Sequence, residues 1–355
     1  MTARQPPRDT AQVTILRALP LPRIPSPDAA PPLRWGILAP GWIARSFAGA
    51  LRAHTRQDLY AVGSRSQASA DAFAAEFGAT KAYGSYEALL ADPAVQAVYV
   101  ASPHSHHASQ ALLAIEAGKP VLVEKAFTRT AVEARRLANA AGAAGVPLME
   151  AMWTRFLPST DIVRQLLADG VLGELETVQA DHGQYFEFDP AHRLFAPELA
   201  GGALLDLGVY PLSFAFFALG RPGALSARGA LAPTGVDRQV SVLADHFADH
   251  PHAHAVLNTT LAARTPTTAS ISGSDARVEI PGPFYVPQAI TLIPRDGEPL
   301  TSDAPAIALH EGLCHEAAHF AQLVADGRLE SPLLPLDESL AIMEALDTIR
   351  TQIAN

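Results

Sequence analysis

Short apolar segments alternate with amphipathic segments along the first half of the chain. The apolar segments are rich in Val, Ile, Leu and Ala and lack the strict alternation of a half-exposed strand, whereas the amphipathic segments carry apolar residues at helical spacing. The predicted strands are residues 33–39, 59–63, 95–101, 119–125 and 146–149, and the predicted helices are residues 41–51, 68–77, 86–90, 108–117 and 131–143. This alternation predicts a doubly wound, parallel Rossmann sheet.

The segment 119–125 ends in a charged pair, Glu124 and Lys125. Its apolar residues predict a central strand that is buried on both faces. Open α/β sheets bind ligands beyond the carboxyl ends of their strands, so the pair is expected at a ligand crevice. The chain has only three lysines, and an unpaired buried ammonium is costly, so Lys125 needs a reason to be there. A structural Glu–Lys pair that closes the strand is the alternative interpretation.

The second half of the chain has a different pattern. Residues 161–168 and 203–219 predict helices, residues 176–182 predict a strand, and residues 184–199 have no clean periodicity. From residue 224 to residue 293, short segments alternate apolar and polar positions. That pattern is typical of an antiparallel sheet with one polar or partner-facing side.

These patterns divide the chain into three parts. Residues 33–155 form the predicted Rossmann domain, and residues 156–355 form an α+β domain with an open, mostly antiparallel sheet. Residues 1–32 hold eight prolines and one short apolar run that is too broken for a signal-peptide core. We expect this first part to be a disordered or loosely docked arm.

Composition narrows the class of protein. The chain has 355 residues, a formal net charge of −10 and a sequence pI of about 5.7, which argues against a nucleic-acid or anionic-membrane partner. By inspection, no uninterrupted apolar run reaches the roughly 18 residues of a membrane span. The single cysteine, Cys314, excludes an internal disulfide and fits a reducing compartment, so we expect a cytoplasmic protein.

The turn after the first strand has the spacing of a dinucleotide-binding loop. Ala39-Pro40-Gly41-Trp42-Ile43-Ala44 follows the G-x-G-x-x-G/A pattern with alanine at the first glycine. A glycine in such a turn lets the backbone approach a pyrophosphate, whose charge is favoured at a helix N-terminus. The pattern is degenerate, but its position between a strand and a helix supports a nucleotide site.

The second strand ends in Ser64 and Arg65, where an NAD site usually has an acidic residue that binds the ribose 2′-hydroxyl. No acid is present, and a guanidinium suits a 2′-phosphate. An exposed arginine before a helix is the plain alternative. The position favours NADP, with NAD still possible.

Three histidines follow the strand 95–101, in Ser102-Pro103-His104-Ser105-His106-His107. No cysteine or carboxylate lies beside them in the sequence, so we expect a cofactor contact or helix capping and no metal site.

Asp206 and Tyr210 lie four residues apart within the predicted helix 203–219 and would share one face of it. Pro211 is expected to kink or restart this helix. A tyrosine acts as a base near neutrality only beside a cation, because its unperturbed pKa is about 10. An exposed or capping pair is the alternative.

The H-E-x-x-H pattern of zinc proteases occurs at His315, Glu316 and His319 on another predicted helix. No recognisable third ligand follows, and so short a pattern arises by chance in a histidine-rich chain. A zinc hydrolase is a remote alternative.

Several motifs together resemble the Gfo/Idh/MocA oxidoreductase family, from about residue 33 to the C-terminus. The strand that ends in Glu124-Lys125 matches the family's Glu-Lys-Pro, with Ala126 in place of proline. Residues 82–87, 148–156 and 201–210 resemble the branch of dimeric dihydrodiol dehydrogenases and NADP-dependent xylose dehydrogenases.

The resemblance implies an enzyme that transfers hydride between NADP and a hydroxyl of a sugar or cyclic trans-diol. It implies that Lys125 polarises the reacting oxygen, that Tyr210 exchanges its proton, and that Asp206 orients the substrate or Lys125. It also implies a homodimer formed through the open sheet. A sensor that keeps the fold without turnover is the alternative within the family.

The candidate site residues fall into two further groups. The expected cofactor contacts are Ala39, Pro40, Gly41, Trp42, Ile43, Ser64, Arg65, Ser102, Pro103, His104, His107, Glu124 and Lys125. The expected substrate contacts are Trp153, Arg155, Phe186, Arg193, Asp206 and Tyr210.

Overall fold

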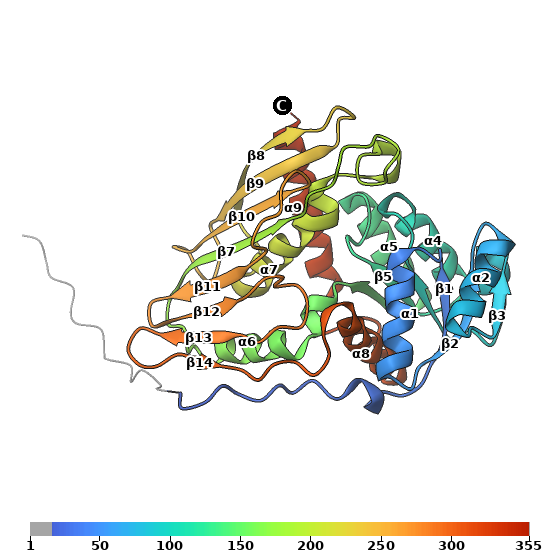
Figure 1. The fold of residues 1–355 in the computed structure, drawn as a ribbon, viewed down its shortest axis with the longest axis horizontal. Coiled ribbons are helices and arrows are strands. Elements are labelled where there is room, and N and C mark those ends of the chain that lie inside the picture. The colour runs from blue at the N-terminus through green and yellow to red at the C-terminus, as the bar shows by residue number, and fades with distance from the viewer. Residues whose placement is uncertain (1–15, 355) are drawn as a thin grey trace, which may run out of the picture.

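The computed structural model describes residues 16–354 and contains, within them, two sheets that lie side by side (Figure 1). The first is a six-stranded parallel sheet in the order β3-β2-β1-β4-β5-β6. Its strands are β1 Arg34–Leu38, β2 Asp58–Gly63, β3 Lys81–Tyr83, β4 Ala97–Val100, β5 Val121–Glu124 and β6 Leu148–Ala151. The connecting helices are α1 Trp42–His54, α2 Gln67–Phe77, α3 Tyr86–Leu90, α4 His104–Glu116 and α5 Ala131–Ala144. The predicted doubly wound fold is confirmed.

The second sheet has eight strands in the order β14-β13-β12-β11-β7-β10-β9-β8 and is mostly antiparallel. Its strands are β7 Leu175–Gly183, β8 Ala224–Leu231, β9 Asp237–Asp245, β10 His254–Thr260, β11 Ala269–Gly273, β12 Ala276–Ile280, β13 Thr291–Pro294 and β14 Leu300–Thr301. The remaining long helices are α6 Pro158–Ala168, α7 Val209–Leu219, α8 Leu313–Ala325 and α9 Leu336–Ile353. The predicted open sheet is therefore also confirmed.

One face of the second sheet packs on α7 and α9, and the other face is open. A cross-strand row on the open face joins Leu243, Val256, Gln179, Ser270, Glu279, Thr291 and Thr301. Leu243 and Val256 are paired in this row, and 42% and 50% of their surfaces are exposed. The face thus combines a polar centre with an exposed apolar pair.

The last two helices return to the first domain, although the expected boundary assigned all residues after 155 to the second. On α8, Phe320 packs against the ring of Trp35 in β1. On α9, Asp347 accepts a hydrogen bond from the backbone N–H of Ala131, which begins α5. The C-terminal part of the chain is therefore shared between both cores.

Residues 16–32 are docked across both domains, while residues 1–15 lie outside the described residues. The backbone N–H and the guanidinium of Arg23 donate to the carboxylate of Asp161 in α6. Arg56, which follows α1, donates to the carbonyl of Asp28, at 2.6 Å. Residues 16–32 are therefore docked by polar contacts near both ends, which is one of the two expected states of the arm.

The most apolar helical stretch is Pro197–Leu219, which is long and apolar enough to span a membrane by composition. Its 18-residue window has a mean hydropathy of 1.6 but is 94% buried within the protein. It ends in α7, which packs on β7 of the second sheet.

Candidate active site

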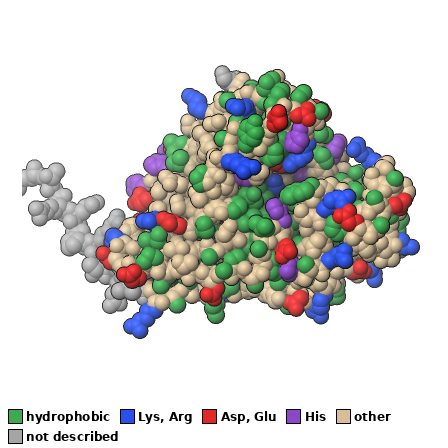
Figure 2. Space-filling view, in the orientation of Figure 1, with side chains coloured by type: hydrophobic (Ala, Val, Ile, Leu, Met, Phe, Trp, Pro, Cys, Tyr) green, Lys and Arg blue, Asp and Glu red, His purple; other side chains and the backbone are tan. Residues whose placement is uncertain are grey.

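Lys125, at the carboxyl end of β5, contacts Asp206 of the second domain, so this edge of the first sheet meets that domain. Several histidine and basic side chains lie near the middle of the face that Figure 2 shows. The loop between β1 and α1 lies at this edge. Ala39, at the first position of the glycine pattern, has a φ of 68°, which is the left-handed conformation that glycine adopts without strain. Gly41 precedes α1, and within residues 16–354 no side chain caps that helix. Its first N–H groups are therefore available to a pyrophosphate.

Ser64 and Arg65 follow β2 at the same edge. The hydroxyl of Ser64 is buried and accepts a bond from the N–H of Ser66. Arg65 is exposed, and its guanidinium has no hydrogen bond or ion pair with the rest of the described chain. An unpaired guanidinium beside an uncapped helix N-terminus, with no acidic residue between them, fits the 2′-phosphate of NADP.

His104 and His107 lie in the first turn of α4, which begins earlier than its predicted start at residue 108. Both ring nitrogens of His107 face backbone carbonyls, at 2.9 Å from Ala126 and 2.8 Å from Ser102. Burial lowers its pKa to about 4, which outweighs the two carbonyls that favour the charged form. His107 therefore joins the segments that follow β4 and β5 inside the protein, and its expected cofactor contact stays a prediction.

Burial likewise lowers the pKa of His104 to about 3. Its ring lies 5.4 Å from that of His107 and feels the charges of Asp206 and Lys125. The Ser102 hydroxyl is buried and finds no hydrogen-bond partner among residues 16–354. Ser102, Pro103 and His104 thus remain candidates for a cofactor contact.

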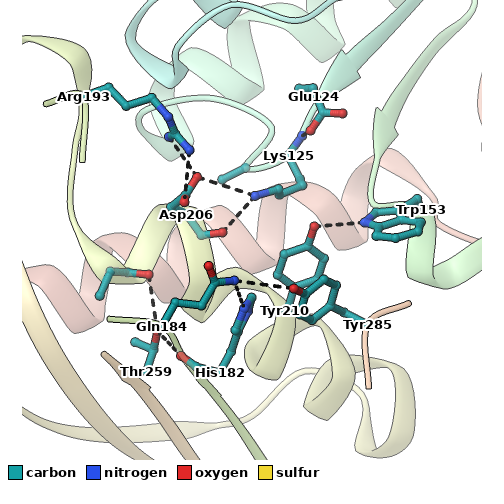
Figure 3. A network of polar contacts seen from close by, with 12 residues as sticks. Glu124, Lys125, Trp153, His182, Gln184, Arg193, Asp206, Tyr210, Thr259 and Tyr285 are labelled. Atoms are coloured by element: carbon teal, nitrogen blue, oxygen red, sulfur yellow. Dashed lines mark hydrogen bonds and ion pairs between the residues drawn. The ribbon is translucent and has the colours of Figure 1, made fainter. Parts of the chain in front are cut away.

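Glu124 and Lys125 end β5, but their side chains diverge, because successive residues of a strand point to opposite faces (Figure 3). The carboxylate of Glu124 accepts a hydrogen bond from the hydroxyl of Tyr99 inside the core. Burial raises the pKa of Glu124 to about 7, against the opposing effect of Lys125. The expectation that the Glu124 carboxylate lies in the crevice is therefore wrong.

Lys125 reaches the second domain. Its ammonium donates to the backbone carbonyl of Asp206, at 2.8 Å, and lies 3.7 Å from the carboxylate of the same residue. Arg193 donates to both carboxylate oxygens of Asp206, at 3.0 and 3.3 Å. Burial favours the neutral carboxyl, but the charges of Lys125 and Arg193 together hold the pKa of Asp206 well below its usual range. Asp206 is thus an anion that two cations share.

The helix that carries Asp206 is irregular at this point. Residues Leu204–Gly208 form a π-turn that runs directly into α7, whereas the sequence predicted a helix over 203–219 that Pro211 kinks or restarts. In a π-turn, the carbonyl of Asp206 would be paired with the residue five places on, which is Pro211 and has no N–H. Lys125 supplies a donor to this carbonyl.

Tyr210 lies one turn beyond Asp206 and faces the same lysine. The Lys125 nitrogen is 4.9 Å from the centre of the phenol ring, and the indole N–H of Trp153 donates to the phenol oxygen at 2.9 Å. Burial raises the pKa of Tyr210 well above its usual value, and Glu124 adds to that effect. Asp206 and Tyr210 are therefore close together, as their spacing predicted, and Lys125 joins them, as the resemblance implied.

Three site residues were missed by sequence reasoning: His182, Gln184 and Tyr285. The imidazole of His182 stacks on Tyr285, whose ring stacks on Tyr210, with centroids 4.5 and 4.7 Å apart. The side-chain amide of Gln184 lies 3.0 Å from the His182 ring (Figure 3). Burial lowers the pKa of His182 to about 4, with a further contribution from Lys125. They come from the end of β7 and from a loop about a hundred residues later, and no local pattern connects those segments.

Arg155 lies apart from this group. It is 3% exposed, and its guanidinium donates to the hydroxyl and carbonyl of Ser213 in α7 and pairs with Glu338 in α9. Arg155 therefore joins the helices of the second domain, and its expected substrate contact stays a prediction. Phe186 packs in a small apolar cluster with residues of the loop that carries Arg193.

The H-E-x-x-H residues lie on α8, behind the first sheet. His319 bonds the Ser331 hydroxyl and stacks on Phe156, while the carboxylate of Glu316 is buried and has no partner in the described part of the chain. Burial raises the pKa of Glu316 well above its usual range. Among residues 16–354 no group of three histidine, cysteine or acidic side chains could hold a metal ion.

Comparisons with known proteins agree with this geometry. Residues 33–152 match the family model described as the GFO_IDH_MocA oxidoreductase family with an NAD-binding Rossmann fold, and residues 161–279 match its C-terminal domain. The chain is 36% identical to D-xylose 1-dehydrogenase (NADP(+)) of Hypocrea jecorina, over 89% of this chain and 90% of that protein. It is 34% identical to trans-1,2-dihydrobenzene-1,2-diol dehydrogenase of Macaca fuscata fuscata, over 90% and 97%. A solved 3-ketoreductase from Actinomadura kijaniata, in complex with NADP and TDP-benzene, has a TM-score of 0.78 and 28% identity, over 91% and 98% of the two chains.

The placement of Arg155 predicts a defect in stability when it is replaced. Arg155→Leu leaves Glu338 without its partner in a buried contact, so we expect the free energy of unfolding to fall by about 2–4 kcal/mol. Chemical denaturation measures this loss, and steady-state kinetics measure KM. A KM that rises tenfold or more at unchanged stability would instead show a substrate contact.

Proposed function

The chain belongs to the Gfo/Idh/MocA family of oxidoreductases, and we propose that it is an NADP-dependent dehydrogenase that oxidises a hydroxyl of a sugar or cyclic trans-diol. The observation that carries this proposal is the position of Lys125. Its ammonium is held by Asp206, beside the phenol of Tyr210, at the same sheet edge as the uncapped helix α1. Such an arrangement combines a binding site for a hydride acceptor with groups that can donate and accept a proton.

When bound, NADP supplies the nicotinamide that accepts hydride from the substrate carbon. In our proposal, the ammonium of Lys125 donates a hydrogen bond to the reacting oxygen and stabilises the negative charge that develops on it. As hydride leaves, the ionised form of Tyr210 accepts the hydroxyl proton, and the ammonium of Lys125 favours that form. Asp206 fixes the direction of Lys125, and Arg193 fixes Asp206.

The walls of the site support a neutral polyol as substrate. The stacked rings of Tyr210, Tyr285 and His182 surround the candidate proton-transfer group with aromatic carbon, which suits a sugar or carbocycle better than a charged substrate. The amide of Gln184 offers hydrogen bonds beside these rings. The guanidinium of Arg193 is engaged by Asp206, so it is not free to neutralise an anionic substrate. The relatives named above act on D-xylose and on a dihydrodiol, which are substrates of this chemical class.

A catalytically inactive sensor of the same fold is the alternative. Retention of Lys125, Asp206 and Tyr210 in contact with one another favours the enzyme, because a sensor needs none of the three to act together. A mixture of NADP with aldoses and trans-diols separates the two: the enzyme forms NADPH, and the sensor binds NADP without forming it.

We also propose that the open face of the second sheet pairs two copies of the chain. This face carries the exposed pair Leu243 and Val256 and a row of polar side chains that extends from Gln179 to Thr301. A self-complementary sheet surface of this kind suits a two-fold dimer.

Cofactor choice is predicted to depend on Arg65. Arg65→Ala should weaken NADP by about 10–100-fold, because one charge-assisted phosphate contact is lost, and should leave NAD almost unchanged. Fluorescence titration with both cofactors measures this difference. Arg136→Ala, which removes another exposed arginine from the same domain, is the matched control. Equal weakening of both cofactors in Arg65→Ala would contradict the assignment.

Turnover is predicted to depend on the hydroxyl of Tyr210. Tyr210→Phe should lower kcat by about 10²–10⁴-fold with NADP affinity retained, because it removes one general acid–base group and keeps the ring. Lys125→Met should lower kcat at least as much. The double variant should lose no more kcat than the more impaired single variant, because both side chains serve one proton transfer. Tyr83→Phe removes a remote hydroxyl that bonds Asp92 and should keep turnover. Near-normal turnover in Tyr210→Phe would remove Tyr210 from the mechanism.

The dimer is predicted to separate when charge is placed on its apolar pair. Val256→Arg should convert a particle of twice 37.5 kDa into one of 37.5 kDa in sedimentation velocity, because two like charges meet across the two-fold axis. Val132→Arg changes an exposed valine on α5 and should leave the dimer intact. A wild-type protein that sediments as a monomer at micromolar concentration would exclude the proposed pairing.

A further inference from the structure

The indole of Trp153 makes a direct hydrogen bond to the candidate acid–base group. Trp153 begins a short 3-10 turn that follows β6, the strand next to β5, so its side chain reaches the same sheet edge as Lys125. Its N–H donates to the oxygen of Tyr210 at 2.9 Å, and the two side chains are 2% and 6% exposed (Figure 3). From the sequence, Trp153 was expected to contact the substrate.

The packing around Trp153 fixes the direction of this N–H. The indole stacks on the imidazole of His310, with ring centres 5.5 Å apart, and meets Tyr285 edge-on at 6.2 Å. A Cβ atom at Gly312 would lie 3.0 Å from the indole ring, so the backbone at Gly312 prevents the indole from moving toward it. An indole held on these sides cannot turn its donor away from Tyr210.

An indole N–H donates and does not accept, so the phenol oxygen is the acceptor in this pair. The proton of Tyr210 must then point away from Trp153. When Tyr210 loses that proton, its oxygen becomes an anion and keeps the same donor, and a hydrogen bond to an anion is about twice as strong as one to a neutral oxygen. Trp153 therefore favours the deprotonated form.

The other groups that face Tyr210 act in both directions. Lys125, from β5, favours the anion, whereas Glu124 from the same strand, Asp206 from the preceding π-turn and Tyr285 from the loop before β13 disfavour it. Tyr99 in β4 interacts with it from the core, and the imidazole of His182 in β7, 5.4 Å away, is neutral near pH 7. Among these groups, Trp153 and Lys125 thus favour the ionised form of Tyr210 and oppose the effect of burial on its pKa.

We infer that Trp153 is a positioning residue that directs the Tyr210 proton away from the indole and stabilises the tyrosinate during turnover. The inference rests on the proposed function, in which Tyr210 takes the substrate proton, and it adds a residue that cannot itself titrate. It also explains why an indole, and no other aromatic ring, suits this position.

The test is the pH dependence of turnover in Trp153→Phe, which keeps an aromatic ring and removes the N–H. In the wild type, kcat for polyol oxidation should rise with pH as Tyr210 ionises. In Trp153→Phe the rise should move to higher pH by about 0.5–1.5 units, with rates converging on those of the wild type at high pH. Trp35→Phe, which removes a buried indole bond to Gln57 far from the site, should lower stability without moving the rise.

Two further measurements distinguish the effect of the Trp153 hydrogen bond from the effect of its ring packing. Trp153→Phe should cause no additional loss in a Tyr210→Phe background, because its effect passes through that hydroxyl. Replacing the tryptophans by a fluorinated analogue with a more acidic N–H keeps the shape and should move the rise to lower pH. A uniform loss across all pH values, an equal loss in the Tyr210→Phe background, or no shift with the analogue would overturn the inference.

Ultraviolet titration of the tyrosinate in NADP-bound protein, taken as wild type minus Tyr210→Phe, is independent of turnover. The pKa of Tyr210 obtained from this titration should rise in Trp153→Phe and fall with the fluorinated analogue. If these shifts occur but no polyol reduces NADP, the proposed function fails and the inference about Trp153 stands. If polyols reduce NADP but neither the titration nor the pH profile moves, the inference alone fails.

Discussion

The charge of Lys125 sets the main constraint on this site. The ammonium stands at the end of an apolar strand, with its side chain 13% exposed, where an unpaired charge is strongly unfavourable. The first domain offers it no carboxylate, because Glu124 turns into the core toward Tyr99. Its partners come from the second domain: the carbonyl and the carboxylate of Asp206. The π-turn before Pro211 makes that carbonyl a suitable acceptor, since proline has no N–H to fill it.

The two domains therefore need each other at the site. Lys125 belongs to the parallel sheet, while Asp206, Tyr210, His182 and Tyr285 belong to the second domain or its loops. Relative movement of a few ångströms would break the Lys125–Asp206 contact, so the rest of the chain restrains the junction. Residues 16–32 bond to α6 of the second domain and to Arg56 of the first. Helices α8 and α9, which follow the second sheet in the sequence, pack against the first domain. These contacts preorganise the charged groups before any ligand is bound.

Much of this could be predicted from local sequence. Apolar runs between amphipathic segments specified the parallel sheet, and the end of such a run placed Lys125 at the crevice. The spacing of Asp206 and Tyr210 suggested that both face one partner, and they do. These are properties of neighbours along the chain, for which strand and helix periodicity are sufficient.

The contacts that the sequence did not predict join distant segments. Arg155 and His107 are polar residues in motifs near the site, but tertiary packing engages them with Ser213, Glu338 and backbone carbonyls. Tyr285 meets Tyr210 at a sequence separation of 75 residues, and Trp153 meets it at a separation of 57. Periodicity describes which way a side chain points from its own element and carries no information about what it meets there. The π-turn was missed for a related reason, since it depends on Lys125 from the other domain as well as on Pro211.

The most direct test of the account is the fate of the hydrogen on the reacting carbon. The protein is incubated with NADP and D-xylose or trans-cyclohexane-1,2-diol deuterated at every carbon, and the reduced cofactor is analysed by mass spectrometry. Hydride transfer beside Lys125 and Tyr210 predicts one deuterium in each NADPH formed, with none released to water. Unlabelled NADPH with deuterium in the solvent, or a deuterated substrate left untouched across the polyol panel while NADP is bound, would contradict it.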